Sequence, residues 1–257
     1  MDINRIINIA SNAGRIILEN GGETYRAEET ITRIFSAYNL EGAETFATPS
    51  IIIISASSLY GQNYSIIKRV KTPGIDLEKI SRINDLSRNI KRLGYSLENI
   101  ENQLEQIDSV KPYKLRYILL FGAVAAGSFT LVFGGDLKDF LVAALAGLSI
   151  KLVSHYMEKA KANEFFVNIF CGFTGTLICH IFYNLNLATN LKLAVIGSLT
   201  LLVPGLAITN AVRDTISGDL VSGMMRTMEA ILIAIGVATG SGMVFKLWIS
   251  IFGGALV

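Results

Sequence analysis

A chain of 257 residues with 51% hydrophobic side chains and a mean hydropathy of +0.46 is too apolar for an ordinary soluble domain. Its formal net charge of +2 gives no reason to expect nucleic acid as a partner. Residues 1–117 hold 15 Lys and Arg and 14 Asp and Glu, whereas the longer remainder holds only 8 and 7. We therefore expect a soluble first part and a lipid-embedded second part.

Two helices are predicted at the start of the first part. Apolar residues recur at helical spacing over residues 2–20, and Gly21 and Gly22 then stop the helix. Thr24 is expected to cap a second helix that runs to about residue 38. No secretory signal peptide is evident in the opening residues, so we expect this part to stay in the cytoplasm.

A small sheet is predicted next. Residues 45–57 and 64–70 are rich in Ile, Val, Thr and Tyr and flank Gly61-Gln62-Asn63, which predicts a β-hairpin. The pattern also allows a third short strand before Pro49. The apolar run at residues 51–54 is too short to span a bilayer and is interpreted as a buried strand.

Two further helices complete the first part. Residues 76–93 are predicted to be helical and to end at Gly94, and residues 97–107 form a shorter helix. We expect residues 1–112 to form a small cytoplasmic α+β domain.

Five apolar segments follow, and each is uncharged or carries a single lysine near its end. This composition is typical of membrane spans, so residues 113–257 are expected to form a transmembrane helical domain. The segments are residues 118–135, 140–156, 165–187, 193–209 and 230–245.

The basic residues that flank these segments favour one orientation. With the first domain in the cytoplasm, most flanking Lys and Arg lie on the inner side, which predicts a cytoplasmic N-terminus and an external C-terminus. The inner flanks hold Lys111, Lys114, Arg116, Lys159, Lys161, Arg213 and Arg226, and the outer flanks hold Lys138, Lys192 and Lys246.

Pro204 and Gly205 interrupt the fourth apolar segment near its middle. A broken helix frees backbone groups that lipid cannot satisfy, so such breaks usually line a cavity or lie against protein. In transporters they often form the substrate site, because the ends of half-helices offer dipoles and free amides. A simple proline kink is the alternative.

Asn210, Arg213 and Asp214 follow this break directly. Arginine can hold a carboxylate through two parallel hydrogen bonds, and Asp214 can balance that charge or carry a proton. The alternative interpretation is a cytoplasmic loop with an ordinary ion pair.

The third apolar segment contains His180, which is a candidate proton relay because histidine titrates near physiological pH. A hydrogen-bonded contact between helices is the alternative. Cys171 and Cys179 form no recognisable metal motif with the two histidines and are expected to be packing residues. The GxxxG pattern from Gly236 to Gly240 predicts close helix packing, within the chain or with a partner.

Several classes of chemistry are not expected. The sequence has no Walker loop, so ATP is not the expected energy source, and no nucleophile-base pair indicates an enzyme. We expect no metal and no cofactor.

Two motif blocks resemble the threonine/serine exporter family, in its N-terminal-type half, and the resemblance covers nearly the whole chain. The later block has Leu202-Val203-Pro204-Gly205, Asn210-Ala211-Val212-Arg213-Asp214, Ser217-Gly218-Asp219 and Gly223. The earlier block has Gly21-Gly22-Glu23-Thr24-Tyr25-Arg26-Ala27-Glu28-Glu29-Thr30, followed by Phe46-Ala47-Thr48-Pro49.

The resemblance implies export of small solutes across a bacterial plasma (inner) membrane, either threonine and serine or short dicarboxylates such as succinate. Some members of the family fuse two membrane halves, and others split them into two chains. Because this sequence ends after its fifth predicted span, the expected partner is a second, shorter membrane subunit of the same family, or further copies of this chain.

The charged residues Glu23, Arg26 and Glu28, together with Asp219, are candidates for a gate or an interface with the membrane domain. Local ion pairs, such as Glu29 with Arg33 at i,i+4 spacing, are the structural alternative.

The sequence thus predicts an α-helical membrane bundle of about five transmembrane helices, preceded by a small α+β cytoplasmic domain. We expect a transporter subunit, coupled to the proton gradient, that binds a small-molecule substrate within the lipid bilayer. A non-transporting membrane scaffold or regulatory subunit is the alternative. The candidate substrate-binding residues are Pro204, Gly205, Asn210, Arg213, Asp214 and His180.

Overall fold

The computed structural model describes residues 2–40, 42–57, 62–71 and 74–252. Its internal contacts divide the chain into two compact units. The first consists of Met1–Lys111 and Gly205–Met228, and the second of Pro112–Pro204 and Glu229–Val257. The first unit therefore includes a segment that the predicted ranges assign to the membrane bundle.

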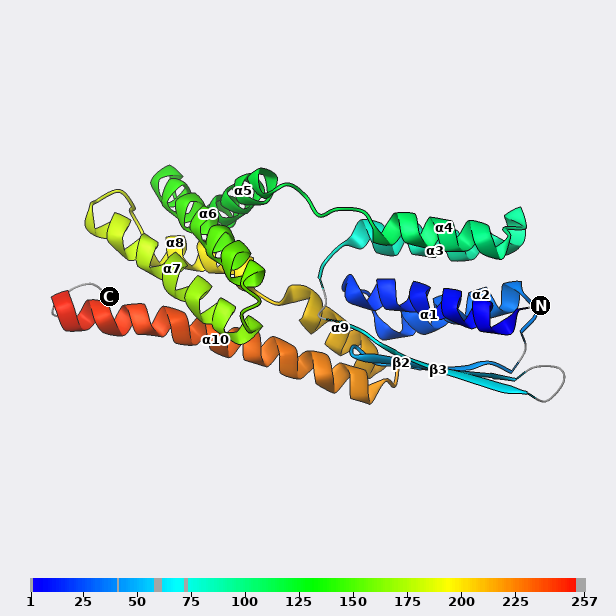
Figure 1. Cartoon of the computed structure of the whole chain (residues 1–257). Helices are drawn as coiled ribbons and strands as arrows, with labels where there is room; N and C mark the ends of the chain where they lie inside the picture. Colours follow the sequence, from blue (N-terminus) through cyan, green and yellow to red (C-terminus); the bar gives the residue numbers. More distant parts are fainter. Residues whose placement is uncertain (1, 41, 58–61, 72–73, 253–257) are drawn as a thin grey trace. The chain divides into compact units, whose positions relative to one another are not determined.

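The first unit packs helices against one face of a three-stranded sheet (Figure 1). Its last two elements come from the distant segment after Pro204. The elements are α1 (Ile3–Glu19), α2 (Thr24–Ala37), β1 (Glu44–Ala47), β2 (Ile51–Ser57), β3 (Asn63–Arg69), α3 (Leu77–Leu93), α4 (Leu97–Asp108), α9 (Gly205–Ile216) and the first turns of α10 (Leu220–Phe252).

The sheet has the order β1-β2-β3 with both pairs antiparallel, which confirms the hairpin and its third strand. Ile52 and Ile54 are fully buried, whereas Ile53 between them is exposed on the opposite face. Residues 51–54 are therefore buried on one face only, because successive side chains of a strand point to opposite faces. Gly61 of the predicted turn lies outside the described residues.

Helix ends in this unit follow local capping chemistry. The Asp76 side chain accepts hydrogen bonds from the backbone at the start of α3, and Gly94 ends that helix in the left-handed region with φ 61°. The prediction for α2 is wrong in one detail. Glu23 occupies the N-cap position, and the Thr24 hydroxyl donates to Asp214 rather than to its own helix.

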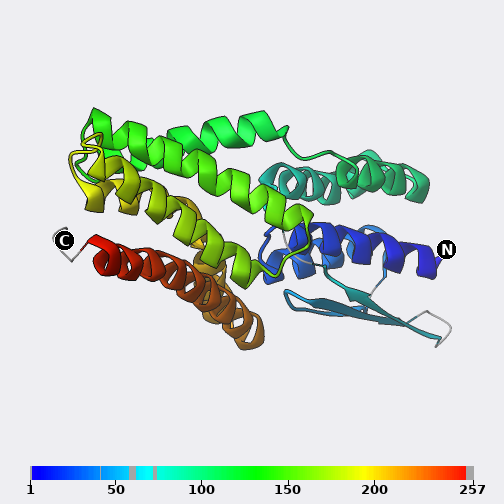
Figure 2. The same ribbon diagram turned by 60° about the vertical axis from the view of Figure 1, so that its left-hand side comes forward.

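The second unit is a helical bundle in which α6 packs between α5 and α7 (Figure 2). The buried carboxylate of Asp139 accepts hydrogen bonds of 2.8 Å from the backbone N–H groups of Thr189 and Asn190, which fixes the loop before α8 to the start of α6. The elements are α5 (Leu115–Val132), α6 (Leu137–Lys159), α7 (Glu164–Asn184), α8 (Leu191–Leu199), the 3-10 turn η1 (Thr200–Leu202) and the remainder of α10.

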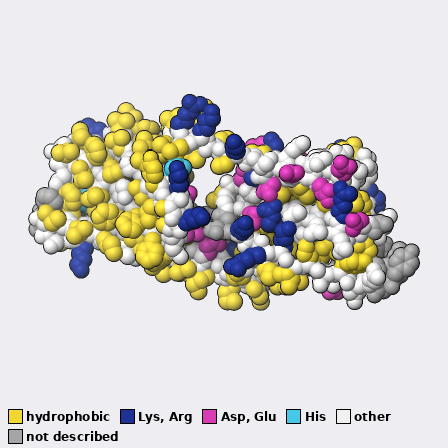
Figure 3. Space-filling model, viewed as in Figure 1, with side chains coloured by type: hydrophobic (Ala, Val, Ile, Leu, Met, Phe, Trp, Pro, Cys, Tyr) yellow, Lys and Arg dark blue, Asp and Glu magenta, His cyan; other side chains and the backbone are white. Residues whose placement is uncertain are grey.

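Within the described residues, four helices are long and apolar enough to cross a membrane: α5, α6, α7 and α10. A fifth span results if α8 with η1 and α9 cross as one broken pair. Many large apolar side chains of these helices are exposed, and Figure 3 shows hydrophobic side chains spread over the visible surface of the bundle. Such a surface suits a lipid environment. The fold is thus mostly helical, with four to five candidate spans and a small sheet.

The fourth apolar segment is interrupted at the predicted position. Helix α8 ends at Leu199, η1 ends at Leu202, and α9 begins only at Gly205. Pro204 has no backbone N–H, so a helix that continued through it would lose a backbone hydrogen bond. The segment is therefore broken rather than gently kinked.

The GxxxG pattern in α10 packs against α7 of the same chain. A Cβ atom added at Gly240 would lie 2.0 Å from the carbonyl oxygen of Ile169, and one at Gly236 would lie 3.1 Å from that of Phe165. The two backbones approach so closely that a side chain at Gly240 does not fit.

Candidate functional site

The two motif blocks, separated by almost 200 residues, meet within the first unit (Figure 1). The earlier block forms the turn between α1 and α2 and the first turns of α2. The later block forms α9 and the start of α10. Hydrogen bonds and ion pairs join these two parts of the chain. The residues that form them, together with the neighbouring Arg26, Glu28 and Asp219, are called the motif cluster: Gly21, Gly22, Glu23, Thr24, Arg26, Glu28, Asn210, Arg213, Asp214, Asp219 and Arg226.

The centre of the motif cluster is a buried ion pair between Asp214 of α9 and Arg226 of α10. Nε of Arg226 lies 3.3 Å from Oδ2 of Asp214, and the two side chains are 5% and 0% exposed. The same carboxylate oxygen accepts a hydrogen bond of 3.2 Å from the Thr24 hydroxyl. Oδ1 of Asp214 has no hydrogen-bond partner among the described residues. The carboxylate therefore keeps an unused acceptor, which is costly in a buried position.

Two side chains, one from α9 and one from α10, hold the glycine turn of the earlier block. Nη2 of Arg226 donates to the carbonyl of Gly22 at 2.6 Å, and Nδ2 of Asn210 donates to that of Gly21 at 3.0 Å. Only glycine fits this turn. Gly21 has φ +87°, and a Cβ at Gly22 would lie 2.4 Å from a methyl carbon of Ile17.

Glu23 stands between two arginines at the edge of the motif cluster. Its carboxylate is paired with Arg26 at 2.7 Å and with Arg213 of α9. Burial tends to raise the pKa of Glu23, but the hydrogen bonds from Arg26 and from its own backbone, with both positive charges, outweigh it and lower the pKa. Arg213 thus pairs with Glu23, while Asp214 pairs with Arg226. The Arg213 side chain remains 47% exposed.

In two further carboxyl groups, those of Glu28 and Asp219, the pKa is raised rather than lowered. Burial raises the pKa of Glu28, and the negative charges of Asp219 and Asp214 raise it further, against a hydrogen bond of 2.8 Å from the backbone N–H of Ala47. Burial and the charge of Asp214 also raise the pKa of Asp219. Among the described residues, neither Glu28 nor Asp219 is in an ion pair. Both are therefore suited to take up protons.

A cavity of about 260 Å³ opens beside this cluster, between the start of α2, α3 and α9. Its polar lining comes mainly from the motif cluster and from α3. The lining residues are Gly21, Gly22, Glu23, Arg26, Leu77, Ile80, Ser81, Asn84, Leu206 and Asn210.

Most of the predicted site residues lie in or next to the motif cluster, whereas His180 belongs to the second unit. Gly205 begins α9, and Pro204 is the last residue of the second unit before it. His180 lies in α7 of the second unit, where its Nδ1 is 2.9 Å from the carbonyl of Thr176 and its ring contacts Phe245 and Trp248. Within the described part of the chain, no group of three or more His, Cys, Asp or Glu side chains has an arrangement that could hold a metal ion.

Arg226 is the main residue that the sequence interpretation missed. The sequence pattern places Arg226 at the inner flank of the last span, because a lone arginine near the end of an apolar helix is typical of that position. The structure buries it instead, as the partner of Asp214. The sequence offers one signal for this pairing, since Arg226 is the only cation between Asp214 and Lys246.

The local ion pair between Glu29 and Arg33 at i,i+4 spacing is confirmed at 2.5 Å.

These features define a multi-pass membrane protein with a polar cluster built from two distant motif blocks. The chain belongs to the threonine/serine exporter family, ThrE, whose family model matches residues 8–248. No solved structure matches the chain.

Curated relatives include members of two lengths. The chain is 24% identical over 252 residues to "Threonine/serine exporter" of Corynebacterium glutamicum, which covers 94% of this chain and 51% of that protein. It is 22% identical over 238 residues to "Probable succinate transporter subunit YjjP" of Klebsiella aerogenes, covering 90% of each. The Escherichia coli K12 protein of the same name is 18% identical over 244 residues, covering 95% of this chain and 94% of that protein. The chain thus spans about half the length of the Corynebacterium relative and nearly all of the other two.

Proposed function

We propose that this chain is a subunit of a secondary membrane transporter that exports small solutes bearing a carboxylate. The substrates are threonine and serine, or a short dicarboxylate such as succinate. Family membership and the names of the relatives support this proposal. The observation that carries it is the motif cluster, which joins a buried charge pair, a glycine turn and a polar cavity directly after a broken candidate span.

The substrate carboxylate is proposed to bind at Arg213 and Asn210, near the Pro204–Gly205 break. Arg213 is half-exposed, and both it and Arg26 pair with the carboxylate of Glu23. A substrate carboxylate can therefore replace Glu23 as the partner of Arg213, while Glu23 stays paired with Arg26. Asp214 then acts through Arg226 and Thr24 to hold α9 in place. In this proposal His180 belongs to a separate part of the pathway in the second unit.

Proton coupling is proposed to use the acidic residues of the motif cluster. Glu28 and Asp219 have raised pKa values and lie near the buried Asp214, so protonation of one relieves repulsion from the others. This arrangement provides a means for proton uptake to change the packing of α2 against α9.

The proposed location is a bacterial inner membrane, with the sheet-containing domain in the cytoplasm. A second, shorter membrane subunit, or further copies of this chain, is proposed to complete the transporter. Two observations support this proposal. Two relatives are named as transporter subunits, and the break in the fourth apolar segment requires surrounding protein at membrane depth.

The test is export of labelled threonine, serine and succinate from proteoliposomes that hold this chain alone, or this chain with a second-half membrane protein of the family. We expect export of at least one substrate only when this chain is assembled with the second protein or with further copies of itself, and faster export when a proton gradient is imposed. Failure of every substrate with both chains would favour a scaffold or regulatory subunit. Export by a monomeric preparation of this chain would contradict the proposal that a partner is required.

A further inference from the structure

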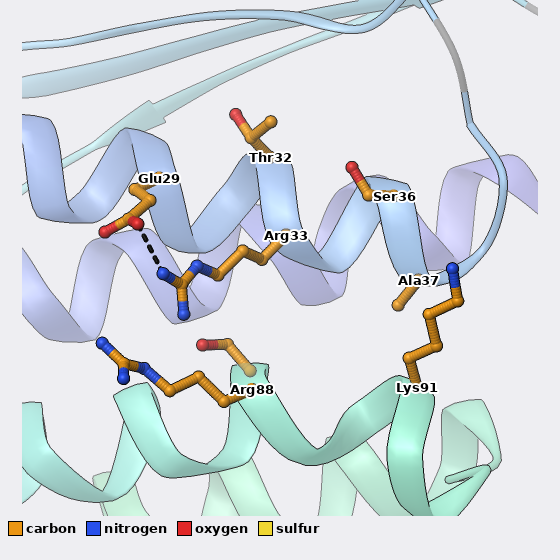
Figure 4. Close-up of a pocket in the computed structure, with 8 residues that line it drawn as sticks. Glu29, Thr32, Arg33, Ser36, Ala37, Arg88 and Lys91 are labelled. Atoms are coloured by element: carbon orange, nitrogen blue, oxygen red, sulfur yellow. Dashed lines mark hydrogen bonds and ion pairs between the residues drawn. The ribbon is translucent and has the colours of Figure 1, made fainter.

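A groove between α2 and α3 involves none of the residues of the motif cluster. It has a volume of about 530 Å³ and lies entirely within the first unit (Figure 4). This volume is within the ordinary range for small-molecule sites. The lining residues are Glu29, Thr32, Arg33, Ser36, Ala37, Ser87, Arg88 and Lys91.

Positive charge exceeds negative charge in this groove. Of its three cations, Arg33 is paired with Glu29 at 2.5 Å. Arg88 and Lys91 have no ion-pair partner within 4.0 Å among the residues that the structure describes. Figure 4 shows the guanidinium groups of Arg33 and Arg88 on facing helices at the same end of the groove, and Lys91 reaching from α3 toward Ala37 at the other end. Two positive charges of the groove therefore have no counter-ion among the described residues.

The hydroxyl groups of the lining add both kinds of hydrogen-bonding group. Thr32 and Ser87 donate to backbone carbonyls of their own helices at 2.9 Å, so their oxygens can still accept hydrogen bonds. The Ser36 hydroxyl has no partner among the described residues and is available as a donor. The groove thus suits a ligand that carries an anionic group and also polar groups.

We propose that this groove binds a small multivalent phosphate, supplied by a soluble phosphorylated metabolite or by a lipid headgroup. An arginine presents its donors in a fork that matches two phosphate oxygens, and Lys91 adds a point charge. A carboxylate of single charge would leave one of the two unpaired cations without compensation. The proposal concerns binding and does not depend on the transport proposal.

The site lies on the same helix as the motif cluster. Helix α2 carries Glu23 at its N-cap, Glu28 near its start and Arg33 and Ser36 in its last turns. Fourteen residues at 1.5 Å per residue make the helix only about 20 Å long. A phosphate that bridges α2 and α3 would therefore restrain the helix on which the charged residues of the motif cluster stand.

The test is titration of the full chain with pyrophosphate, in nanodiscs of phosphatidylcholine. We expect saturable binding that weakens as the salt concentration rises. Arg88→Gln and Lys91→Gln should each raise the Kd about tenfold, the value expected for loss of one charge-assisted hydrogen bond. Arg92→Gln is the matched control, because Arg92 is an exposed cation on α3 that does not line the groove. It should leave the Kd unchanged.

A second series of nanodiscs separates the two sources of the phosphate. These nanodiscs contain cardiolipin, a lipid whose headgroup carries two phosphates. If pyrophosphate binds more weakly in these nanodiscs than in phosphatidylcholine alone, and Arg88→Gln abolishes this difference between the two lipids, the site binds a lipid headgroup. Unchanged binding would assign it to a soluble phosphate. The proposal is overturned if pyrophosphate does not bind, or if Arg92→Gln weakens binding as much as Arg88→Gln does.

Discussion

Asp214 and Arg226, twelve residues apart in sequence, form an ion pair whose side chains are 0% and 5% exposed. Arg226 also donates to the carbonyl of Gly22, and Asp214 also accepts from the hydroxyl of Thr24. Each partner of the pair is thus tied to the turn that starts α2. The pair fixes α9 and α10 to one another and to the earlier motif block.

Breaking this pair should destabilise the first unit strongly. Arg226→Met removes the guanidinium and leaves Asp214 buried without a charge partner, which is expected to cost about 3–5 kcal/mol. The measurement is denaturant unfolding of the purified full chain in detergent, with Arg213→Met as control. Arg213 forms an exposed pair, so its loss should cost only about 0–1 kcal/mol.

The double variant Asp214→Asn, Arg226→Met tests whether the pair acts as a unit. Removing both charges avoids a lone buried ion, so the double variant should lose less stability than the sum of the two single variants. Additive losses would show that the two side chains contribute independently and would contradict the pairing.

Much of the fold was predictable, because its signals are local. The periodic apolar residues of α1, the alternation in β2 and the capping residues Asp76 and Gly94 act on their immediate neighbours. The pairings in the motif cluster were not predictable in the same way. Arg213 and Asp214 are adjacent in sequence, yet each pairs with a residue on another element, because successive residues of a helix point in different directions.

The glycines of α10 give a test of packing in the second unit. A Cβ at Gly240 would overlap the carbonyl oxygen of Ile169, so Gly240→Ala should force α7 and α10 apart and cost about 1–3 kcal/mol. Gly242→Ala is the matched control on the same helix, since a Cβ there meets nothing within 4 Å. It should be neutral or stabilise by about 0.5–1 kcal/mol. Equal thermal stability of the two variants in detergent would contradict the close packing.

Glu28 gives a prediction about pH. Its pKa is raised in the folded protein, so the folded state binds this proton more tightly than the unfolded state does. The resulting stability is present at pH values below the ordinary glutamate pKa and is lost as the pH rises through the raised value. Glu28→Gln keeps an acceptor for the N–H of Ala47 and removes the titration.

We therefore expect Glu28→Gln to reduce the loss of stability between acidic and neutral pH, and to flatten the pH dependence of export. The measurement is thermal unfolding of the full chain as a function of pH, in parallel with transport. Glu29→Gln is the control, because Glu29 is exposed and pairs with Arg33. A pH profile of unfolding that Glu28→Gln leaves unchanged would remove this residue from the proposed proton uptake.

The orientation of the chain is open to a direct test. The bias of basic flanking residues predicts a cytoplasmic N-terminus, and five spans then place the C-terminus outside. The described residues contain four candidate spans, or five if α8 and α9 cross as one broken pair. Reporter fusions at both ends decide between them. A cytoplasmic C-terminus would show that the broken pair does not cross.

Arg213 is the residue on which the substrate proposal depends most. Its guanidinium pairs with Glu23, which Arg26 also binds, so Glu23 keeps a partner when Arg213 turns to a substrate. Lysine at this position keeps the charge but loses the two-pronged donor that matches a carboxylate. Arg213→Lys is therefore expected to lower export about tenfold at matched membrane abundance, and Arg213→Ala to abolish it.

The competing account is that Arg213 only sets the orientation of the chain in the membrane, for which charge alone is sufficient. Arg116→Lys is the control, because Arg116 is an exposed inner-flank residue that has no ion pair among the described residues. Export should be unaffected in that variant. Normal export by Arg213→Lys would favour the orientation role, since a lysine preserves the charge. Normal export by Arg213→Ala would exclude Arg213 from substrate binding. The carboxylate would then have to be held by the two side-chain donors of the motif cluster that line the cavity, Asn210 and Arg26.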